Sequence, residues 1–275
     1  MTQPTIAFIG AGHVAGSLIR GLVADGYDAG QIIAADPNAA QLAALRSQTG
    51  VRTAGDNAAA VASAEVVVLA VKPQILQTVA RQIAGAVQGH RPLVISIVAG
   101  IRERTLQGWL GGGLPLVRTM PNTPAMIGAG ATVLHATPEV TPEQQDTAES
   151  ILRAVGLTRW VEDEDLMDAV TALSGSGPAY FFLVMEAMEQ AALELGLPGE
   201  TARLLTLQTA LGAARMAMES HDDPATLRQR VTSPGGTTER ALAVFEERGL
   251  RSAFAAALMA ARDRSVELSD LLGGS

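Results

Sequence analysis

Short β-branched runs alternate with amphipathic helical stretches over residues 1–162. This alternation is typical of a mostly parallel sheet that is wrapped by helices, so we expect an α/β domain here. The runs predict strands at Thr5–Ile9, Gln31–Ala35, Val66–Val71, Leu93–Ile97, Leu116–Thr119, Ala131–His135 and Thr158–Glu162. Thr141-Pro142-Glu143-Gln144 has the form of a capping box with proline at the first helical position, and it predicts a helix from there to about Ala154.

The hydrophobic pattern changes after residue 162, where the β-branched runs stop. Residues 163–275 read as a second, all-α domain, whose helices are separated by glycine and proline at Ser174–Pro178, Gly196–Pro198, His221–Pro224, Ser233–Gly236 and Gly249. Ala179–Leu195 and Ala202–Met218 are apolar on too many faces for surface helices. We therefore expect a partner subunit to cover them.

A glycine-rich loop follows the first predicted strand directly. Residues 10–15 read Gly-x-Gly-x-x-Ala between a strand and a helix, the fingerprint of a dinucleotide site. Gly10 allows the tight turn, Gly12 lets the backbone approach a pyrophosphate, and Ala15 keeps the helix close to the strand. The alternative is a plain turn. The predicted cofactor contacts of this loop are Ile9, Gly10, Ala11, Gly12, His13, Val14 and Ala15.

Asp36 stands at the end of the second predicted strand. Its carboxylate can accept hydrogen bonds from a ribose and would repel the 2′-phosphate of NADP unless a cation intervenes. The next basic residue along the chain is Arg46, so local chemistry favours NAD or the use of both cofactors. The alternative is a helix cap, with Pro37 at the first helical position.

Composition narrows the possible functions. The chain has 275 residues, of which 48% are hydrophobic and 17% are charged, as in an ordinary globular protein. There is no cysteine, which excludes disulfides and thiolate chemistry, and the four histidines lack ligand spacing, so no metal is expected. A net charge of −8 without a Lys/Arg cluster argues against nucleic acid. Without a long apolar run or a basic leader, we expect no membrane contact and a cytoplasmic location.

Five short motifs distinguish this chain from other dinucleotide-binding sequences. They are Ala70-Val71-Lys72-Pro73, Ser96–Gly100, Arg118–Pro124, Ser174–Tyr180 and Val231–Thr238. In their order and spacing the chain resembles pyrroline-5-carboxylate reductase over nearly its whole length. The resemblance implies a Rossmann-type dinucleotide-binding domain (1–162), followed by a helical substrate-binding and dimerisation domain (163–275). It also implies the reduction of Δ1-pyrroline-5-carboxylate to L-proline by NADPH or NADH.

The resemblance also assigns roles to residues of these motifs. It places the substrate carboxylate on the loop Ser233–Thr238, whose free N–H groups suit an anion, and it places Thr238 near the ring nitrogen. The implied substrate contacts are Ser176, Gly177, Ser233, Gly235, Gly236, Thr237 and Thr238. Further implied cofactor contacts are Asn57, Ala70, Val71, Lys72, Pro73 and Ala99. The family's intertwined dimer would cover the apolar helices, and rings of dimers stay open.

For several of these residues a purely structural role is the alternative to a contact with cofactor or substrate. Thr237 or Thr238 could cap a helix, Ser176 could cap the helix that Pro178 enters, and Asp56-Asn57 could be a cap as well. Lys72 invites a catalytic role, but the resemblance indicates that its segment follows the cofactor mainly through backbone. His13-Val14 departs from the family, which usually has asparagine and methionine there, and the role of His13 stays open. Arg118 and Asn122 are expected to brace the domain junction.

Three other functions compete with this one. A β-hydroxyacid dehydrogenase also joins a dinucleotide domain to a helical one, but it needs a lysine on the first long helix of the second domain, and residues 174–220 contain none. An imine reductase for a related cyclic imine stays open, because the sequence does not size the pocket. A non-catalytic NAD(P)-sensing regulatory protein is disfavoured by the intact substrate-loop motifs.

Overall fold

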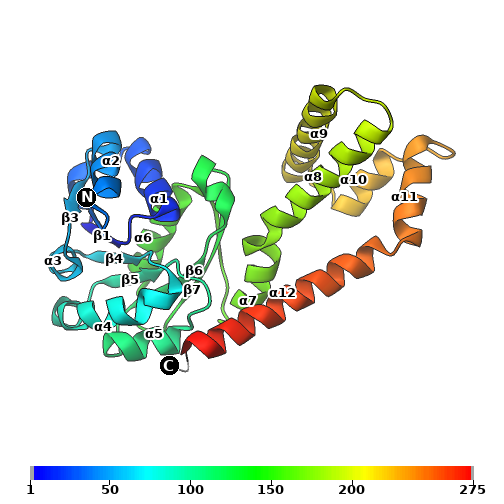
Figure 1. Ribbon diagram of the computed structural model, residues 1–275. Helices are drawn as coiled ribbons and strands as arrows, with labels where there is room; N and C mark the ends of the chain where they lie inside the picture. The colour runs from blue at the N-terminus through cyan, green and yellow to red at the C-terminus, as the bar shows by residue number, and fades with distance from the viewer. Residues whose placement is uncertain (1–2, 274–275) are drawn as a thin grey trace. The chain divides into compact units, whose positions relative to one another are not determined.

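The computed structural model describes residues 3–273 (Figure 1). Contacts divide the chain into two compact units. The first unit contains the residues up to 176 together with those from 261 onward, and the second unit contains residues 177–260. The change from strands to helices does fall near residue 162, since the last strand ends at Trp160. Residues 163–176 nevertheless group with the first unit by contacts, and a domain boundary after residue 162 stays a prediction.

Within the described residues, eight strands of the first unit form one sheet in the order β3-β2-β1-β4-β5-β6-β7-β8. Neighbouring strands are parallel except β6 and β7, which are antiparallel. The mostly parallel α/β fold is therefore confirmed, with the doubly wound strand order of dinucleotide-binding domains. The strands are β1 (Ile6–Ile9), β2 (Ile32–Ala35), β3 (Arg52–Ala54), β4 (Val66–Leu69), β5 (Leu93–Ser96), β6 (Leu116–Met120), β7 (Gly130–Ala136) and β8 (Gly156–Trp160).

Strand β3 is the one that the sequence pattern missed. It has three residues, begins with the exposed Arg52 and pairs with β2 alone. A short strand at the edge of a sheet needs no continuous apolar run, because only one neighbour and part of one face cover it. The pattern of buried residues therefore carried no signal for it.

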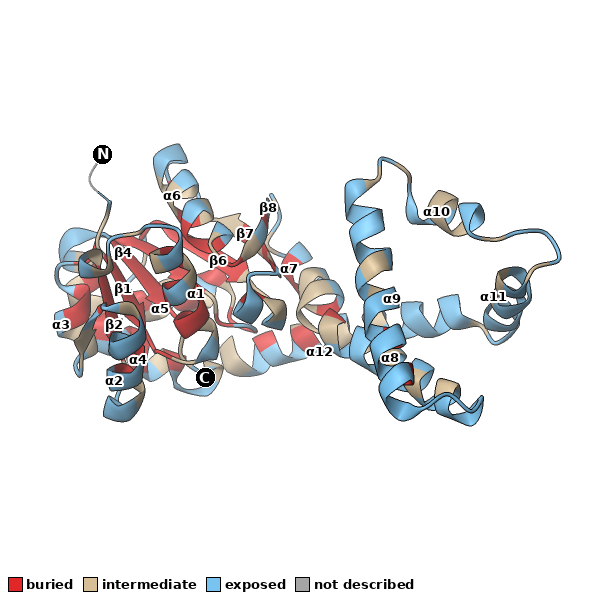
Figure 2. Ribbon diagram, turned by 90° about the horizontal axis from the view of Figure 1, so that it is seen from above, coloured by how far each residue is buried: buried red, intermediate tan, exposed pale blue. Residues whose placement is uncertain are grey.

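Helices cover both faces of this sheet. Phe8 of β1 packs in one buried cluster with Leu18 and Leu152, whereas the next residue of the strand, Ile9, packs in a second cluster with Leu76 and Leu106. Figure 2 shows the strands as the buried centre of the unit. The helices of this unit are α1 (His13–Ala24), α2 (Ala39–Thr49), α3 (Asn57–Val61), α4 (Pro73–His90), α5 (Glu103–Leu110), α6 (Pro142–Arg153) and α7 (Leu166–Val170).

The start of α6 is the predicted capping box. The Thr141 hydroxyl accepts a hydrogen bond from the Gln144 N–H at 3.3 Å, and the Gln144 side chain accepts one from the Thr141 N–H at 3.1 Å. Both bonds satisfy donors that a helix N-terminus leaves unpaired. The helix ends at Arg153, so the prediction from sequence is confirmed.

A buried charged cluster joins the sheet to α5 and to the loop before α7. Arg118 of β6 is 3% exposed and pairs with Glu164 at 2.6 Å, and Glu164 also accepts from the Glu103 N–H at 2.8 Å. The Glu103 carboxylate lies 2.6 Å from Nδ1 of His135 on β7. Burial raises the pKa of Glu103. Arg118 and Glu164 both belong to the first unit, so a role of Arg118 at the domain junction stays a prediction.

The end of the long helix α12 (Leu250–Gly273) returns to the first unit. Its Ser265 hydroxyl donates to the Asp168 carboxylate of α7 at 2.6 Å, and both residues are buried. Arg102 lies 3.3 Å from the other oxygen of Asp168. Two segments that are 97 residues apart are thus held together by one carboxylate.

The second unit is helical, as predicted. It contains α8 (Gly177–Glu194), α9 (Gly199–Glu219), α10 (Pro224–Arg230), α11 (Thr237–Glu247) and the first part of α12. Phe181, Phe182 and Leu183 of α8 are each more than 60% exposed, and α9 exposes Leu204 and Met216 to a similar degree. Figure 2 shows α8 and α9 as largely exposed. The expectation that these helices carry uncovered apolar faces is confirmed. Among the described residues, no helix is both long enough and apolar enough to cross a bilayer.

Candidate functional site

The glycine-rich loop connects β1 to α1 as the sequence predicted. Gly10 has φ = +98°, and a Cβ atom there would lie 2.7 Å from the carbonyl oxygen of Ala70, so only glycine fits. Gly12 is the N-cap of α1, and a Cβ atom on it would meet nothing within 4 Å. No side chain caps this helix. Its first-turn N–H groups and the open space at Gly12 therefore fit a bound pyrophosphate.

Asp36 follows β2 and fixes the glycine-rich loop. Its carboxylate accepts from the Ala11 N–H at 2.9 Å and from the Asn38 N–H at 2.8 Å. The α2 helix begins at Ala39, and its cap is Asn38, whose side chain accepts from the Gln41 N–H. The reading of Asp36 as the helix cap, with Pro37 at the first helical position, is therefore wrong. Asp36 instead ties the end of β2 to the loop after β1.

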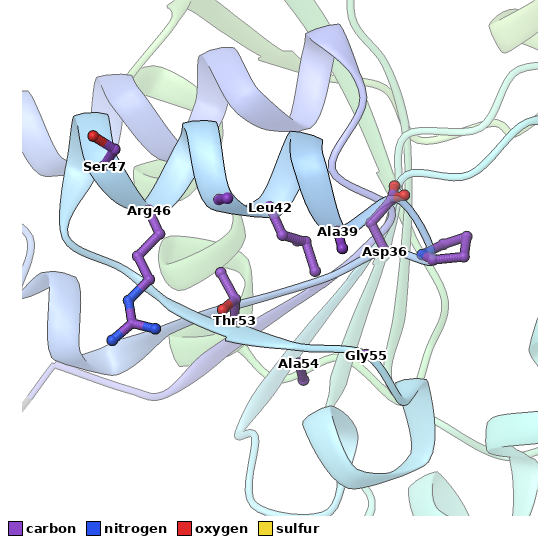
Figure 3. A pocket seen from close by; sticks show the side chains of 10 residues that line it. Asp36, Ala39, Leu42, Arg46, Ser47, Thr53, Ala54 and Gly55 are labelled. Carbon is purple, nitrogen blue, oxygen red and sulfur yellow. The ribbon is translucent and has the colours of Figure 1, made fainter.

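A pocket of about 620 Å³ lies between α2 and β3. Figure 3 shows Asp36 at one end of it. Arg46 of α2 lies at the other end and reaches across toward β3. Sequence reasoning noted Arg46 only as the next cation along the chain, but positions 39, 42, 43 and 46 share one helix face and line this pocket together. Arg46 belongs to none of the ion pairs found among residues 3–273. The lining residues are Asp36, Pro37, Ala39, Leu42, Ala43, Arg46, Ser47, Thr53, Ala54 and Gly55.

The other predicted cofactor residues follow the neighbouring strands β4 and β5. The backbone of Ala70 packs against Gly10. Lys72 is the N-cap of α4, and Pro73 is the first residue of that helix. Ala99 follows β5. Because β1, β2, β4 and β5 are parallel, their carboxyl ends lie at one edge of the sheet, where open α/β sheets bind ligands. The edge includes the β1–β4 position, where the strand order reverses.

Two further predicted cofactor residues, Asn57 and His13, lie at the first residues of helices α3 and α1. Asn57 is the first residue of α3, whose cap is Asp56, and its amide lies 3.3 Å from the Gln82 side chain. Asp56 is therefore the cap and Asn57 is not, and a cofactor contact of Asn57 stays a prediction. His13 is exposed at the first turn of α1. Gln41, which sequence reasoning missed, donates its side-chain amide to the carbonyl of Ala11.

The predicted substrate loop of the second unit lies between α10 and α11. Gly236 is the N-cap of α11 and no side chain caps the helix, so the reading of Thr237 or Thr238 as the cap is wrong. Both threonines lie in the first helical turn, where N–H groups lack helical acceptors. Gly235 has φ = +71°, and its N–H donates to the Glu239 carboxylate at 2.7 Å. The Gly236 N–H donates to the Ser233 carbonyl at 2.9 Å. An anion site on the remaining N–H groups, those of Thr237 and Thr238, stays a prediction.

Ser176 does not begin a helix. A π-helix over Thr171–Gly175 connects α7 to α8, and Ser176 has helical torsions (φ −83°, ψ −20°) instead of the extended ones that an N-cap needs. The break predicted at Ser174–Pro178 falls where the π-helix ends and α8 begins, at Gly177, although the backbone keeps helical torsions through Ser176. Only the cap reading of Ser176 is wrong. Among the described residues, no group of three His, Asp or Glu side chains could hold a metal ion.

Gly10 and Gly12 provide a matched pair of variants. We expect Gly12→Ala to lower the free energy of unfolding by less than about 1 kcal/mol, because its Cβ meets nothing and only the N-cap preference for glycine is lost. The same variant should weaken dinucleotide binding about tenfold by blocking the pyrophosphate. Gly10→Ala should instead lower the free energy of unfolding by about 1–3 kcal/mol, because φ is positive and Ala70 is in the way. Thermal unfolding and fluorescence titration with NADPH measure both. Wild-type affinity in Gly12→Ala would contradict the assignment.

Two family models match the chain. The model described as pyrroline-5-carboxylate reductase dimerisation matches residues 164–268, and the model described as NADP oxidoreductase, coenzyme F420-dependent, matches residues 5–100. The first covers the helical part and the second covers the half of the sheet with the glycine-rich loop. The two matches agree with the organisation that the motifs implied.

Similar proteins cover the whole chain. Pyrroline-5-carboxylate reductase from Pseudomonas aeruginosa is 51% identical over 99% of this chain and all of its own length, and the enzyme from Vibrio alginolyticus is 44% identical. A solved pyrroline-5-carboxylate reductase from Coxiella burnetii has a TM-score of 0.94, 47% identity and coverage of 98% and 99% of the two chains. One from Plasmodium falciparum, solved with NADP bound, has a TM-score of 0.86, 26% identity and the same coverage. The resemblance seen in the motifs is confirmed, and the chain belongs to the pyrroline-5-carboxylate reductase family.

Proposed function

We propose that this protein reduces Δ1-pyrroline-5-carboxylate to L-proline with NAD(P)H, the last step of proline biosynthesis. The observation that carries the proposal is its similarity along nearly the entire chain to reductases of that name, including a 51% identical relative. The two loops needed for such a reaction are also present. One leads into α1 and the other into α11, and neither helix has a side-chain cap, so the first-turn N–H groups suit a dinucleotide and a carboxylate.

The residues at the carboxyl edge of the sheet fit the cofactor, which supplies a hydride when it is bound. The open N–H groups at Gly12 and the first turn of α1 would hold the pyrophosphate, and Asp36 would accept from the adenosine ribose. The loops after β4 and β5, with Ala70–Pro73 and Ala99, would line the rest of the dinucleotide. The side chain of Lys72 has no catalytic part in this proposal.

The second loop handles the substrate. We place the substrate carboxylate on the N–H groups of the Ser233–Thr238 loop, with Ser176 and Gly177 as further contacts. The hydride adds to the carbon of the C=N bond, whose π electrons pass to the nitrogen. An imine that binds already protonated ends as the secondary amine without another proton. The main role of Thr238 is therefore to orient the ring nitrogen, and relaying a proton is its secondary role, since a hydroxyl is a weak acid.

The test is the absorbance of the reduced nicotinamide. The purified protein is expected to oxidise NADPH and NADH in the presence of Δ1-pyrroline-5-carboxylate and to form proline in equal amount. A 3-hydroxyacid with the oxidised cofactors is the control for the dehydrogenase alternative. Absence of substrate-dependent oxidation of either cofactor would overturn the proposed function.

Cofactor choice depends on the two ends of the pocket in Figure 3. We expect the wild type to accept both cofactors, because Asp36 favours a free ribose and Arg46 in the same pocket favours a 2′-phosphate. Asp36→Ser is expected to raise the NADPH/NADH ratio of kcat/KM about tenfold, or about 1.4 kcal/mol, by removing like-charge repulsion.

Arg46→Ala is expected to lower the same ratio about fivefold, and Arg52→Ala to leave it unchanged, since exposed Arg52 lies outside the pocket. Steady-state kinetics with each cofactor measure these ratios. An unchanged ratio in Asp36→Ser would show that its carboxylate serves only the loop bonds to Ala11 and Asn38.

The protein forms a homodimer in this proposal, in agreement with the dimerisation model that matches residues 164–268. The exposed apolar residues of α8 and α9 would supply the buried surface. We propose in addition that dimers join into a ring, because these helices expose apolar side chains along much of their length. Light scattering should give a mass of several dimers, and a mass of one dimer would contradict the ring. The cytoplasmic location expected from the sequence stays a proposal.

A further inference from the structure

One family motif has no role in the proposed function, the segment Arg118–Pro124 at the end of β6. Its Asn122 uses both ends of its side-chain amide inside the first unit. Oδ1 accepts from the Ala131 N–H of β7 at 2.9 Å. Nδ2 lies 3.3 Å from both the carbonyl oxygen and the hydroxyl of Ser174. Asn122 thus connects the sheet to the segment between α7 and α8.

The segment that Asn122 holds is the π-helix Thr171–Gly175, in which the Ser176 N–H donates to the Thr171 carbonyl at 2.8 Å. A π turn departs from the regular register of helical hydrogen bonds and often marks a functional site. A carbonyl group that this change of register leaves without a helical donor needs one from outside the helix. The Asn122 amide is such a donor for Ser174.

Met120, the last residue of β6, holds the same turn two residues before Asn122. A Cβ atom on Gly175 would lie 2.3 Å from the Met120 methyl carbon, so the methionine packs directly against the glycine backbone. Residues 120 and 122 of one strand end thus contact residues 174 and 175 of the turn. The turn is fixed by one apolar contact and one amide, and the residue that follows it is Ser176.

We propose that Asn122 is a positioning residue for substrate binding. It holds the π turn so that Ser176, the residue after the turn, has a fixed place on the first unit from which to contact the substrate. The inference rests on the proposed function, because the substrate role of Ser176 and Gly177 belongs to it. Asn122 itself has no part in the chemistry, since its amide is committed to Ser174 and Ala131.

The decisive variant is Asn122→Asp. The carboxylate keeps an acceptor for Ala131 but loses the donor to Ser174, so β7 stays attached and the turn is released. We expect KM for Δ1-pyrroline-5-carboxylate to rise about tenfold, with kcat and KM for NADPH within about twofold of the wild type. Ser174→Ala keeps the main-chain acceptor, and its KM should rise less than about threefold.

Asn122→Ser is the second variant, for use if Asn122→Asp folds poorly. It shortens the side chain and should raise the substrate KM as well. Thermal unfolding and the NADPH KM control for general damage. A substrate KM within twofold of the wild type in a folded Asn122 variant would overturn the inference. So would an equal rise of both KM values. A wild type that does not oxidise NADPH with this substrate would instead overturn the proposed function.

Discussion

The close approach of Gly10 to the carbonyl of Ala70 is the contact on which the cofactor edge depends. It joins the loop after β1 to the loop after β4, at the position where the strand order reverses. A side chain at residue 10 would push these loops apart, because its Cβ atom would lie 2.7 Å from the Ala70 carbonyl oxygen, which is too close for two atoms that are not bonded. The bond from Gly10 N–H to Ala35 and the bond from Ala11 N–H to Asp36 fix the same loop to β2. Three strand ends thus share one turn.

The far half of the sheet is fixed by charges and amides. Arg118 and Glu164 form a buried pair, Glu103 is held by His135, and Asp168 joins α7 to the end of α12. Buried charges of this kind are tolerable only when each has a partner. Among the described residues, no buried side-chain nitrogen or oxygen lacks one. The network gives the segment before α8 a defined place on the sheet, as Asn122 does for the π turn.

The main errors of sequence reasoning concern helix starts. Ser, Thr and Asp are favoured as caps, so residue preference pointed to Asp36, Ser176 and Thr237 or Thr238. In the structure the caps are Asn38 and Gly236, and Ser176, which stands between the π-helix and α8, has helical torsions. Residue preference alone does not identify the N-cap, because several residues that can cap a helix stand within three positions of each other. The backbone torsions, which depend on what the loop contacts, decide among them.

The sequence by itself determined the parallel sheet, the helical second part, the glycine-rich loop and the family, because each is encoded in local hydrophobic periods and short motifs. Only the tertiary structure brought Arg46 into the pocket with Asp36, paired Glu103 with His135 and placed Asn122 against Ser174. Those pairs are separated by 10, 32 and 52 residues, and their contact follows from how helices and strands pack. Long-range contacts leave no period in the chain, so a single sequence carries no signal for them.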